Sequence, residues 1–270
     1  MALRLSGTCD ASDLHRVLRP LDATAEVIDL SAVSFVTPSG LVALTTYAAS
    51  LREWDVQVTL TAPVKQDVAN YLARSRLGDV LDTLGVGHNL PVVREHRADS
   101  LWELQSFSNS REVAAFAAHI HGEVARSSEE GADEIFACLC EAGDNVGQHS
   151  GQPLGYLAAQ RYQDGKVLFA VGDAGSGFLH SLRPRGAQTD VEALRLALEA
   201  GVSAVDDQGR GYGLHDMARS LGELRGSMSI ISGRDAVRSS ARGVQNLTRR
   251  SVSLQGSVVS GMFPLPHDTP

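Results

Sequence analysis

The fold of this chain depends on the stretch Lys166-Val-Leu-Phe-Ala-Val-Gly-Asp-Ala-Gly-Ser-Gly177. Its first half is a short apolar run, which predicts a buried strand that leads directly into a glycine-rich loop. Asp173 lies at the end of this strand, beside glycines that let a backbone and a ligand touch, an arrangement common in ligand sites. An ionised Asp accepts hydrogen bonds and so suits the exocyclic amino group of adenine. A tight Asp-Gly turn is the simpler interpretation of this loop taken alone.

Length and composition bound the class of protein. The chain has 270 residues, and at roughly 150 residues per domain this length predicts two domains. Hydrophobic residues make up 43% and charged residues 21%, so wholesale disorder is excluded and a sizeable core is expected. The formal net charge is −8, and Lys occurs only at Lys65 and Lys166. Such a charge gives no general attraction to nucleic acid or to an anionic membrane, so we expect neither as a partner.

The three cysteines, Cys9, Cys138 and Cys140, form neither a disulfide framework nor a zinc pattern. An odd cysteine count and a start without the apolar core of a secretory leader indicate a reducing compartment. No run of about 18 apolar residues occurs, so no membrane-spanning helix is predicted. We therefore expect a soluble, cytoplasmic protein.

Residues 1–90 alternate between strand-like and helix-like patterns. Strand–helix–strand–helix order predicts a small sheet with helices packed on it. A glycine- and proline-punctuated stretch at 85–91 predicts a linker, which divides the chain into domains 1–90 and 91–270. The expected elements of the first domain are strands at 25–30 and 56–60 and helices at about 38–52 and 65–74.

The second domain also mixes helices and strands, with its strands concentrated toward the end. The overall prediction is thus an α/β (α+β) fold. The expected helices lie at about 111–125, 133–149, 191–200 and 214–221, and the expected strands at 166–171, 227–231, 236–240 and 253–263.

A second motif, Glu141-Ala-Gly-Asp-Asn145, falls inside the helix expected at 133–149. Residues four apart share a helical face, so Glu141 and Asn145 should project together. An amide oxygen can bind Mg²⁺ while a carboxylate orients or deprotonates a nucleophile. Gly143 costs the helix roughly 1 kcal/mol relative to Ala, which indicates a close approach at this point. A solvated polar face is the simpler interpretation of this motif alone.

A third motif, Gly209-Arg-Gly-Tyr-Gly-Leu214, immediately precedes an expected helix. Glycines at alternate positions expose successive backbone N–H groups, and the helix behind them adds its positive end, which together make a cradle for phosphates. The spacing fits neither a Walker loop nor a dinucleotide fingerprint. Taken alone, the motif is also compatible with a flexible linker.

In order and spacing, the three motifs together resemble the N, G1 and G2 boxes of the GHKL (Bergerat) ATP-binding fold. The resemblance covers roughly residues 100–265 and implies an α/β two-layer sandwich that binds ATP and Mg²⁺. Within that superfamily the sequence is most similar to the anti-sigma-factor and stand-alone sensor type. No dimerisation helix with an acceptor His precedes the motifs, so autophosphorylation on His is not expected.

The resemblance also implies a role for each matching residue. Glu141 would activate water or a substrate hydroxyl, Asn145 would hold Mg²⁺ against the phosphates, and Asp173 would read the adenine. The segment 178–208 would be the ATP lid, and Ser257 stands where the family often has Thr near the phosphates. The glycines divide into Gly175 and Gly177, which would line the base pocket, and Gly209, Gly211 and Gly213, which would wrap the phosphates together with Leu214.

The first domain contains Ile28-Asp-Leu-Ser-Ala-Val-Ser-Phe-Val-Thr-Pro-Ser-Gly-Leu41, which resembles the signature of STAS domains, the anti-sigma-factor-antagonist fold. In that family a strand leads to Asp-Ser-Ser-Gly-Leu, whose first Ser accepts phosphate. Here Thr37 stands at the Asp position and Pro38 at the acceptor position, so the usual phospho-switch cannot operate there. Thr37 and Ser39 are explained more simply by helix capping near Pro38. We therefore expect a docking or scaffolding module.

These resemblances predict an ATP- and Mg²⁺-binding regulatory protein of partner-switching type, with slow ATP hydrolysis or phosphoryl transfer to a Ser or Thr of a protein partner. A STAS-type antagonist, a sigma factor or another regulator is the expected partner, and family habit suggests a homodimer. The alternative is a nucleotide-gated binding module without significant turnover. A serine hydrolase is disfavoured because no Gly-x-Ser-x-Gly elbow occurs.

Overall fold

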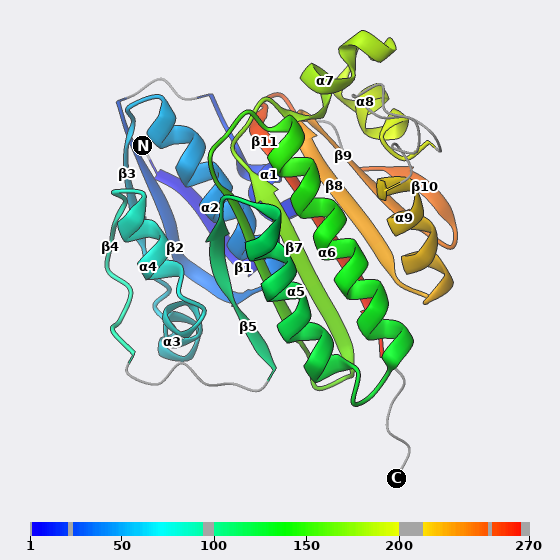
Figure 1. Ribbon diagram of the computed structural model, residues 1–270. Helices are drawn as coiled ribbons and strands as arrows, with labels where there is room; N and C mark the ends of the chain where they lie inside the picture. The colour runs from blue at the N-terminus through cyan, green and yellow to red at the C-terminus, as the bar shows by residue number, and fades with distance from the viewer. Residues whose placement is uncertain (1, 21–23, 94–99, 200–212, 248–249, 266–270) are drawn as a thin grey trace.

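The computed structural model describes residues 2–20, 24–93, 100–199, 213–247 and 250–265, which form a mixed α/β fold (Figure 1). These residues build a parallel sheet of four strands and an antiparallel sheet of seven strands, both accompanied by helices. The α/β class expected from the sequence is confirmed. Within the described part of the chain, no helix has both the length and the apolar character needed to cross a membrane.

The first sheet has the strand order β1-β2-β3-β4, and each neighbouring pair is parallel. Parallel neighbours require crossover connections, and the helices between the strands provide them. The periodic patterns correctly predicted β2, α2, β3 and α3, whereas the other four elements were not expected. In chain order the elements are β1 (Ala2–Cys9), α1 (Ala11–Val17), β2 (Ala25–Val36), α2 (Pro38–Glu53), β3 (Gln57–Thr61), α3 (Gln66–Arg74), α4 (Leu77–Thr83) and β4 (Gly87–His88).

Two boundaries of this sheet differ from the prediction. Strand β2 continues to Val36, because its pairing with β1 shifts register after Asp29 and the buried positions change from Ile28 and Leu30 to Val33 and Val36. A strict period of two ends at such an irregularity, so the sequence pattern stops at residue 30. The expected linker at 85–91 also contributes β4, which pairs with β3.

Helix α2 begins with a complete N-terminal cap. The Thr37 hydroxyl accepts a hydrogen bond from the Gly40 N–H at 3.1 Å, and Pro38 occupies the first turn. The Ser39 hydroxyl lies 3.0 Å from that of Thr37 and accepts from the Ala11 N–H at 3.4 Å. The capping role expected for Thr37 is therefore confirmed, whereas Ser39 bonds the Thr37 hydroxyl and the first N–H of α1.

The second sheet has the order β10-β9-β8-β11-β7-β6-β5, and its neighbouring strands are antiparallel. Strand β11 lies between β8 and β7, so the end of the chain completes the middle of the sheet. The elements are β5 (Leu101–Phe107), α5 (Ser110–Val124), α6 (Glu129–His149), β6 (Gly155–Arg161), β7 (Lys166–Asp173), α7 (Gly177–Leu182), the 3₁₀ turn η1 (Arg183–Arg185), α8 (Asp190–Leu196), α9 (Gly213–Glu223), β8 (Ser227–Gly233), β9 (Asp235–Ser240), β10 (Gly243–Asn246) and β11 (Leu254–Pro264).

Both faces of the second sheet are covered. Alternate residues of a strand point to opposite faces. In β7, Phe169 and Val171 belong to the apolar core shared with α5, α6 and α9, whereas Ala170 belongs to the core shared with α1 and α2. A Cβ atom on Gly172 would lie 2.7 Å from Val42 of α2, so small residues on this face let the helix pack closely.

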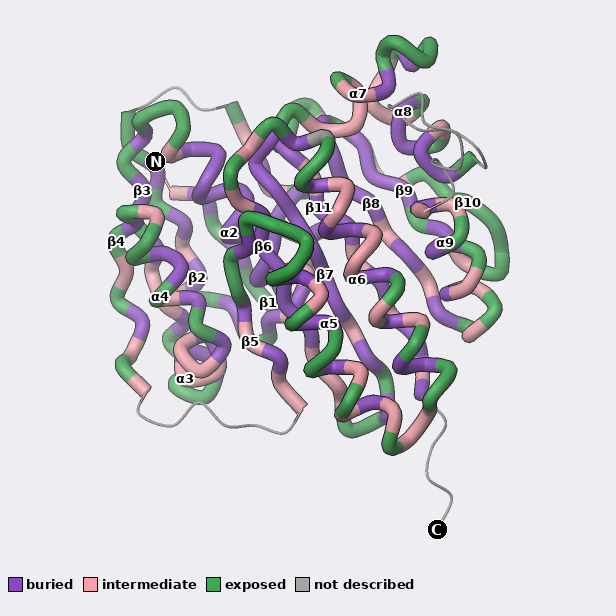
Figure 2. The backbone as a smooth tube through the Cα atoms, in the orientation of Figure 1, coloured by how far each residue is buried: buried purple, intermediate pink, exposed green. Residues whose placement is uncertain are grey.

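Helix α2 thus lies between the two sheets. Figure 2 shows it buried along most of its length, consistent with the burial of nearly every residue from Pro38 to Leu51. One side of the helix contacts β3, and the other contacts β6, β7 and β11. The apolar core of the first sheet therefore continues through α2 onto the second sheet, which positions the end of β7 next to the N-terminal part of the chain.

Candidate functional site

The site is built around Asp173, the last residue of β7. Its carboxylate is buried, with 3% of the residue exposed. One oxygen accepts from the Gly175 N–H at 2.8 Å, and the other accepts from the Ser257 hydroxyl at 2.5 Å. Ser257 is the direct partner of Asp173 in the pairing of β11 with β7. Burial raises the pKa of Asp173 above its ordinary value of 3.8, and the hydrogen bonds from Ser257 and Gly175 oppose that rise.

The loop after Asp173 is held against the end of α6. A Cβ atom on Gly175 would overlap the backbone of Ser150, and the Ser176 N–H donates to the Ser150 carbonyl at 3.1 Å. Gly177 has a φ of +72°, which favours glycine. The structure thus gives Gly175 a steric reason and Gly177 a conformational reason to be glycine, in addition to the base-pocket role that the sequence suggested.

The second motif lies on α6, as expected. The Asn145 side-chain amide donates to the Glu141 carbonyl at 2.9 Å and to its carboxylate at 3.2 Å. The two side chains therefore lie side by side. A Cβ atom on Gly143 would lie 2.7 Å from Val113 of α5, so the close approach that this glycine indicated is a helix–helix contact.

The end of the third motif meets the second motif. Helix α9 begins at Gly213, and a Cβ atom on this residue would overlap the Glu141 carboxylate. Leu214 is buried in the core beneath α6 and α9. Gly209 and Gly211 lie outside the described residues, so their expected contacts with phosphate remain predictions.

The described part of the expected lid, residues 178–199, is folded. Helix α8 starts with a capping box in which Thr189 and Glu192 bond each other's backbone. Leu182 and Leu194 are buried in the second core. This part of the expected lid is therefore a packed element, and residues 200–208 of the segment lie outside the described part.

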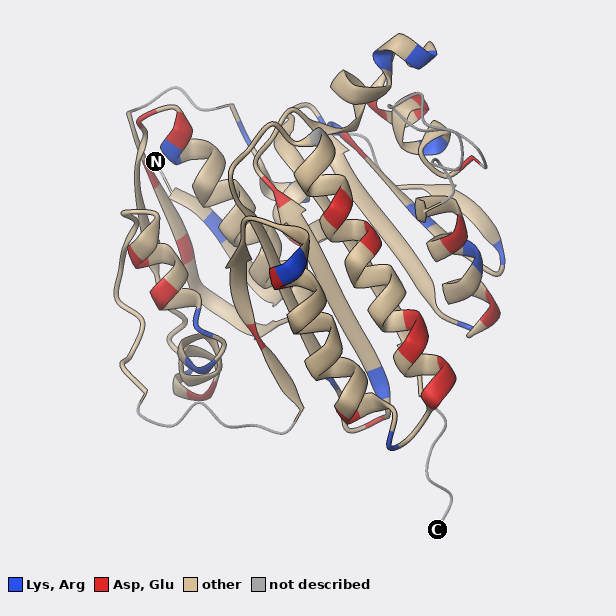
Figure 3. Ribbon diagram, in the orientation of Figure 1, with Lys and Arg blue, Asp and Glu red and all other residues tan. Residues whose placement is uncertain are grey.

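Charge around the second motif is strongly acidic. Figure 3 shows acidic residues at several points along the α6 ribbon, and the sequence of this helix includes Glu141 and Asp144. Among the residues that the structure describes, no group of three His, Cys, Asp or Glu side chains could hold a metal ion by itself. A cation here would need further oxygen ligands, such as those a phosphate chain brings, and the side-by-side carboxylate and amide of Glu141 and Asn145 fit such a hard cation.

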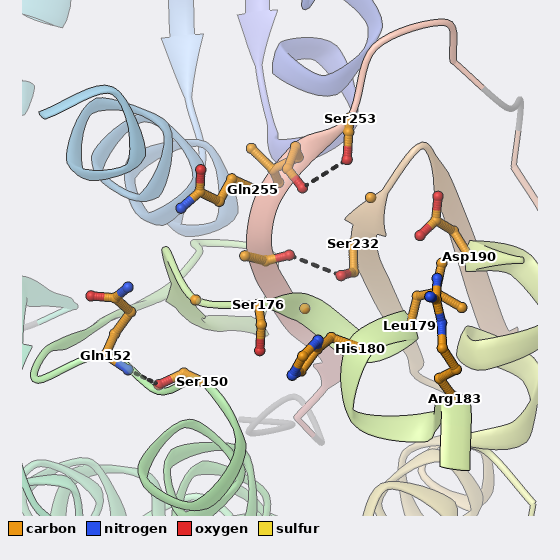
Figure 4. Close-up of a pocket in the computed structure, with 15 residues that line it drawn as sticks. Ser150, Gln152, Ser176, Leu179, His180, Arg183, Asp190, Ser232, Ser253 and Gln255 are labelled. Carbon is orange, nitrogen blue, oxygen red and sulfur yellow. Dashed lines mark hydrogen bonds between the residues drawn. The ribbon is translucent and has the colours of Figure 1, made fainter. Parts of the chain in front are cut away.

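A cleft of about 550 Å³ lies beside the Asp173 loop (Figure 4). It extends between α7, the end of β8 and the start of β11, and most of its residues were not predicted from the sequence. The missed signal is a β-bulge near the start of β11. There the pairing with β8 shifts register between Leu254 and Ser257, and Gly256 has a φ of +91°. The polar side chains that line the cleft are those of Ser150, Gln152, Ser176, His180, Arg183, Asp190, Ser232, Ser253 and Gln255.

No protein-family model matches the chain, and no curated protein matches it. Among solved structures, the chain is similar to full-length ShkA in complex with AMPPNP, with 16% identity, a TM-score of 0.31 and coverage of 85% of this chain. It spans 46% of that ShkA chain. It is also similar to the histidine kinase domain of the Erythrobacter litoralis EL346 blue-light activated histidine kinase, with 11% identity, a TM-score of 0.28, and coverage of 83% of this chain and 91% of that one. These are distant structural similarities.

Proposed function

We propose that the part of the chain built on the second sheet binds ATP together with Mg²⁺, and that the whole chain is a regulatory protein of partner-switching type. One observation carries this proposal. Helix α6 connects parts of the motifs that are far apart in the sequence: its Glu141 lies against Gly213 at the start of α9, and Ser150 at its end bonds the loop after Asp173, whose buried carboxylate is hydrogen-bonded.

Adenine recognition is assigned to Asp173. A buried carboxylate is costly unless it is satisfied, and Ser257 and Gly175 each supply one hydrogen bond. A carboxylate can accept further hydrogen bonds, and the exocyclic amino group of adenine is a matching donor. Guanine carries a carbonyl oxygen at the equivalent position, so an ionised Asp173 would favour ATP over GTP.

Phosphate binding is assigned to the junction of α6 and α9. The N-terminus of a helix favours anions, and α9 begins at Gly213 next to Glu141. With the Asn145 amide nitrogen donating to Glu141, its oxygen is the atom that would bind Mg²⁺. Mg²⁺ would neutralise phosphate charge beside an acidic helix. Gly209 and Gly211 would complete the cradle.

Glu141 is the proposed general base. It would take the proton of an attacking water or of a partner's Ser or Thr hydroxyl while that oxygen bonds the γ-phosphorus and the bond to the bridging oxygen breaks. Water as the nucleophile gives slow hydrolysis, and a hydroxyl gives phosphoryl transfer. Incubation with γ-labelled ATP and STAS-type proteins separates the two, because only transfer leaves label on the protein.

The first sheet is proposed to be a STAS-like docking module, on the sequence signature around Thr37–Leu41 and on its parallel sheet with helices. A nucleotide-gated binding module without turnover is the second candidate. The burial of α2 between the sheets favours it, because this helix contacts both β3 and the strand that ends at Asp173. In that case a bound nucleotide would change the affinity of a partner without being consumed.

The proposed function is tested by nucleotide binding. We expect wild-type protein to bind ATP more tightly with Mg²⁺ than without it, and Asn145→Ala to lose most of this dependence. Asp173→Ala should weaken ATP binding at least tenfold, about 1.4 kcal/mol, and reduce the preference for ATP over GTP. Glu141→Gln should bind ATP normally and lose turnover. Isothermal titration and a phosphate-release assay measure these quantities; wild-type protein that binds no ATP contradicts the proposal.

A further inference from the structure

The side chain of Gln255 connects the loop after Asp173 to the end of α2. Its amide oxygen accepts from the Trp54 indole N–H at 2.6 Å. Its amide nitrogen donates to the Glu53 carboxylate at 2.8 Å and to the carbonyl of Ala174 at 3.2 Å. Ala174 directly follows Asp173, so one side chain bonds both the loop and the C-terminal end of α2.

The bulge in β11 explains how Gln255 reaches both partners. Gly256 has a left-handed φ of +91°, and a Cβ atom there would overlap the Asp173 carbonyl. Strand β11 therefore lies close against the loop after Asp173 at Gly256, and the side chain of the preceding residue, Gln255, is directed toward α2. Figure 4 shows Gln255 on the side of β11 nearest α2, the light-blue helix. The residues on either side of Gly256 thus have separate tasks: Gln255 bonds the loop backbone, and Ser257 bonds the Asp173 carboxylate.

We propose that Gln255 is a positioning residue for base recognition, and that the N-terminal part of the chain, through Glu53 and Trp54, sets the position of the Asp173 loop. The expected effect on nucleotide selectivity rests on the proposed function. The positioning of the loop by Gln255, in contrast, is a property of the protein without nucleotide. It makes α2 part of the nucleotide site's support, although no residue of α2 is needed to contact the base.

The charges around Gln255 fit this role. Glu53 and Asp173 are both carboxylates, and burial together with the charge of Asp173 raises the pKa of Glu53, while the hydrogen bond from Gln255 lowers it. A neutral amide can donate to Glu53 and to the Ala174 carbonyl at once. A carboxylate at the same position would keep the bond from Trp54, lose both donated bonds and add a third negative charge.

The chain offers a matched control. Gln160 of β6 accepts a hydrogen bond from the Tyr71 hydroxyl at 2.9 Å, so it is also a glutamine bonded to an aromatic side chain of the N-terminal part. It pairs with Leu168, well before Asp173 along β7. Gln160→Ala therefore removes a comparable bond between the two parts of the chain without touching the loop.

The test combines amide hydrogen exchange without nucleotide and titration with ATP and GTP, each in the presence of Mg²⁺. Gln255→Ala and Gln255→Glu should increase exchange at Gly175 and Ser176 about tenfold, the loss expected for one or two hydrogen bonds, whereas Gln160→Ala leaves it unchanged. The ratio of ATP to GTP affinity should fall in both Gln255 variants, and Trp54→Phe should have a smaller effect in the same direction. Thermal melts check that the variants are folded.

Exchange at Gly175 and Ser176 that is unchanged in Gln255→Ala overturns the positioning role, whatever the protein binds. Faster exchange with an unchanged affinity ratio overturns the link to base recognition. If wild-type protein binds neither nucleotide, the proposed function fails, and the exchange comparison still decides whether Gln255 holds the loop.

Discussion

At the scale of single residues, Asp173 places a carboxylate where water is excluded. Because burial raises its pKa, the folded protein binds a proton at this site more tightly than the unfolded chain does. Its contribution therefore favours folding fully below the unfolded pKa, near 3.8, and is lost as the pH rises through the higher folded pKa. Above the folded pKa the ionised group costs stability relative to its protonated form.

This sign gives a prediction for Asp173→Asn. The neutral amide avoids the cost of a buried charge, so we expect a higher melting temperature than wild type at pH 7 and a difference that shrinks as the pH falls toward 3.8. Asp164→Asn is the control, and its effect on stability should have the opposite sign. A side-chain hydrogen bond from Lys166 lowers the pKa of that exposed Asp. Calorimetry over a pH series measures both; equal melting temperatures for wild type and Asp173→Asn at pH 7 contradict the prediction.

At the scale of elements, the close contact between α2 and β7 is possible because Gly172 has no side chain. A Cβ atom on Gly172 would lie 2.7 Å from Val42, 2.8 Å from the Thr46 hydroxyl and 2.9 Å from the Ser257 carbonyl. Two of these neighbours belong to α2 and the third to β11, so the helix and both strands would have to separate. Close packing tolerates such insertions poorly.

Gly172→Ala should therefore lower the free energy of unfolding by about 1–3 kcal/mol. Gly122→Ala is the matched control: Gly122 is exposed on α5 with no atom within 4 Å of a Cβ, and the change should raise helix stability by up to about 1 kcal/mol. Urea denaturation measures both values. A Gly172→Ala protein as stable as wild type would show that α2 is not packed tightly on β7.

At the scale of the whole molecule, the two sheets share an apolar core. The buried cluster that begins with Leu3 and Ile28 in the first sheet includes Leu41 and Leu44 of α2 and reaches Ala170 and Val258 in the second. Removing either sheet would expose this surface to water, so the folded state of each part is stabilised by the other.

We expect the chain to unfold in a single cooperative transition. The two tryptophans make the test direct, because Trp54 follows α2 and Trp102 lies buried in β5. Trp54→Phe leaves only Trp102 to report, and Trp102→Phe leaves only Trp54. In each variant the fluorescence midpoint should equal the calorimetric midpoint. Two separate transitions would mean that the sheets unfold independently.

Much of the local structure could be predicted from the sequence, and the motifs indicated candidate site residues. Periodic patterns predicted α2 and α5, and the glycine-rich loop after a buried strand identified Asp173 as a candidate ligand-binding residue. Helix capping at Thr37 was also readable, because a cap depends on neighbours along the chain. Irregular elements such as the bulged end of β2 could not be predicted, because a register shift interrupts the alternation of buried and exposed residues that indicates a strand.

Which of these segments contact one another became clear from the three-dimensional fold. Nothing in the local sequence places Gly213 against Glu141, gives Asp173 its bond from Ser257, or puts Gln255 between that loop and Trp54. Nor does it place α2 between two sheets. Periodicity reports which side of an element avoids water but not which element covers it, and that choice depends on the strand order and close packing of segments distant in the chain.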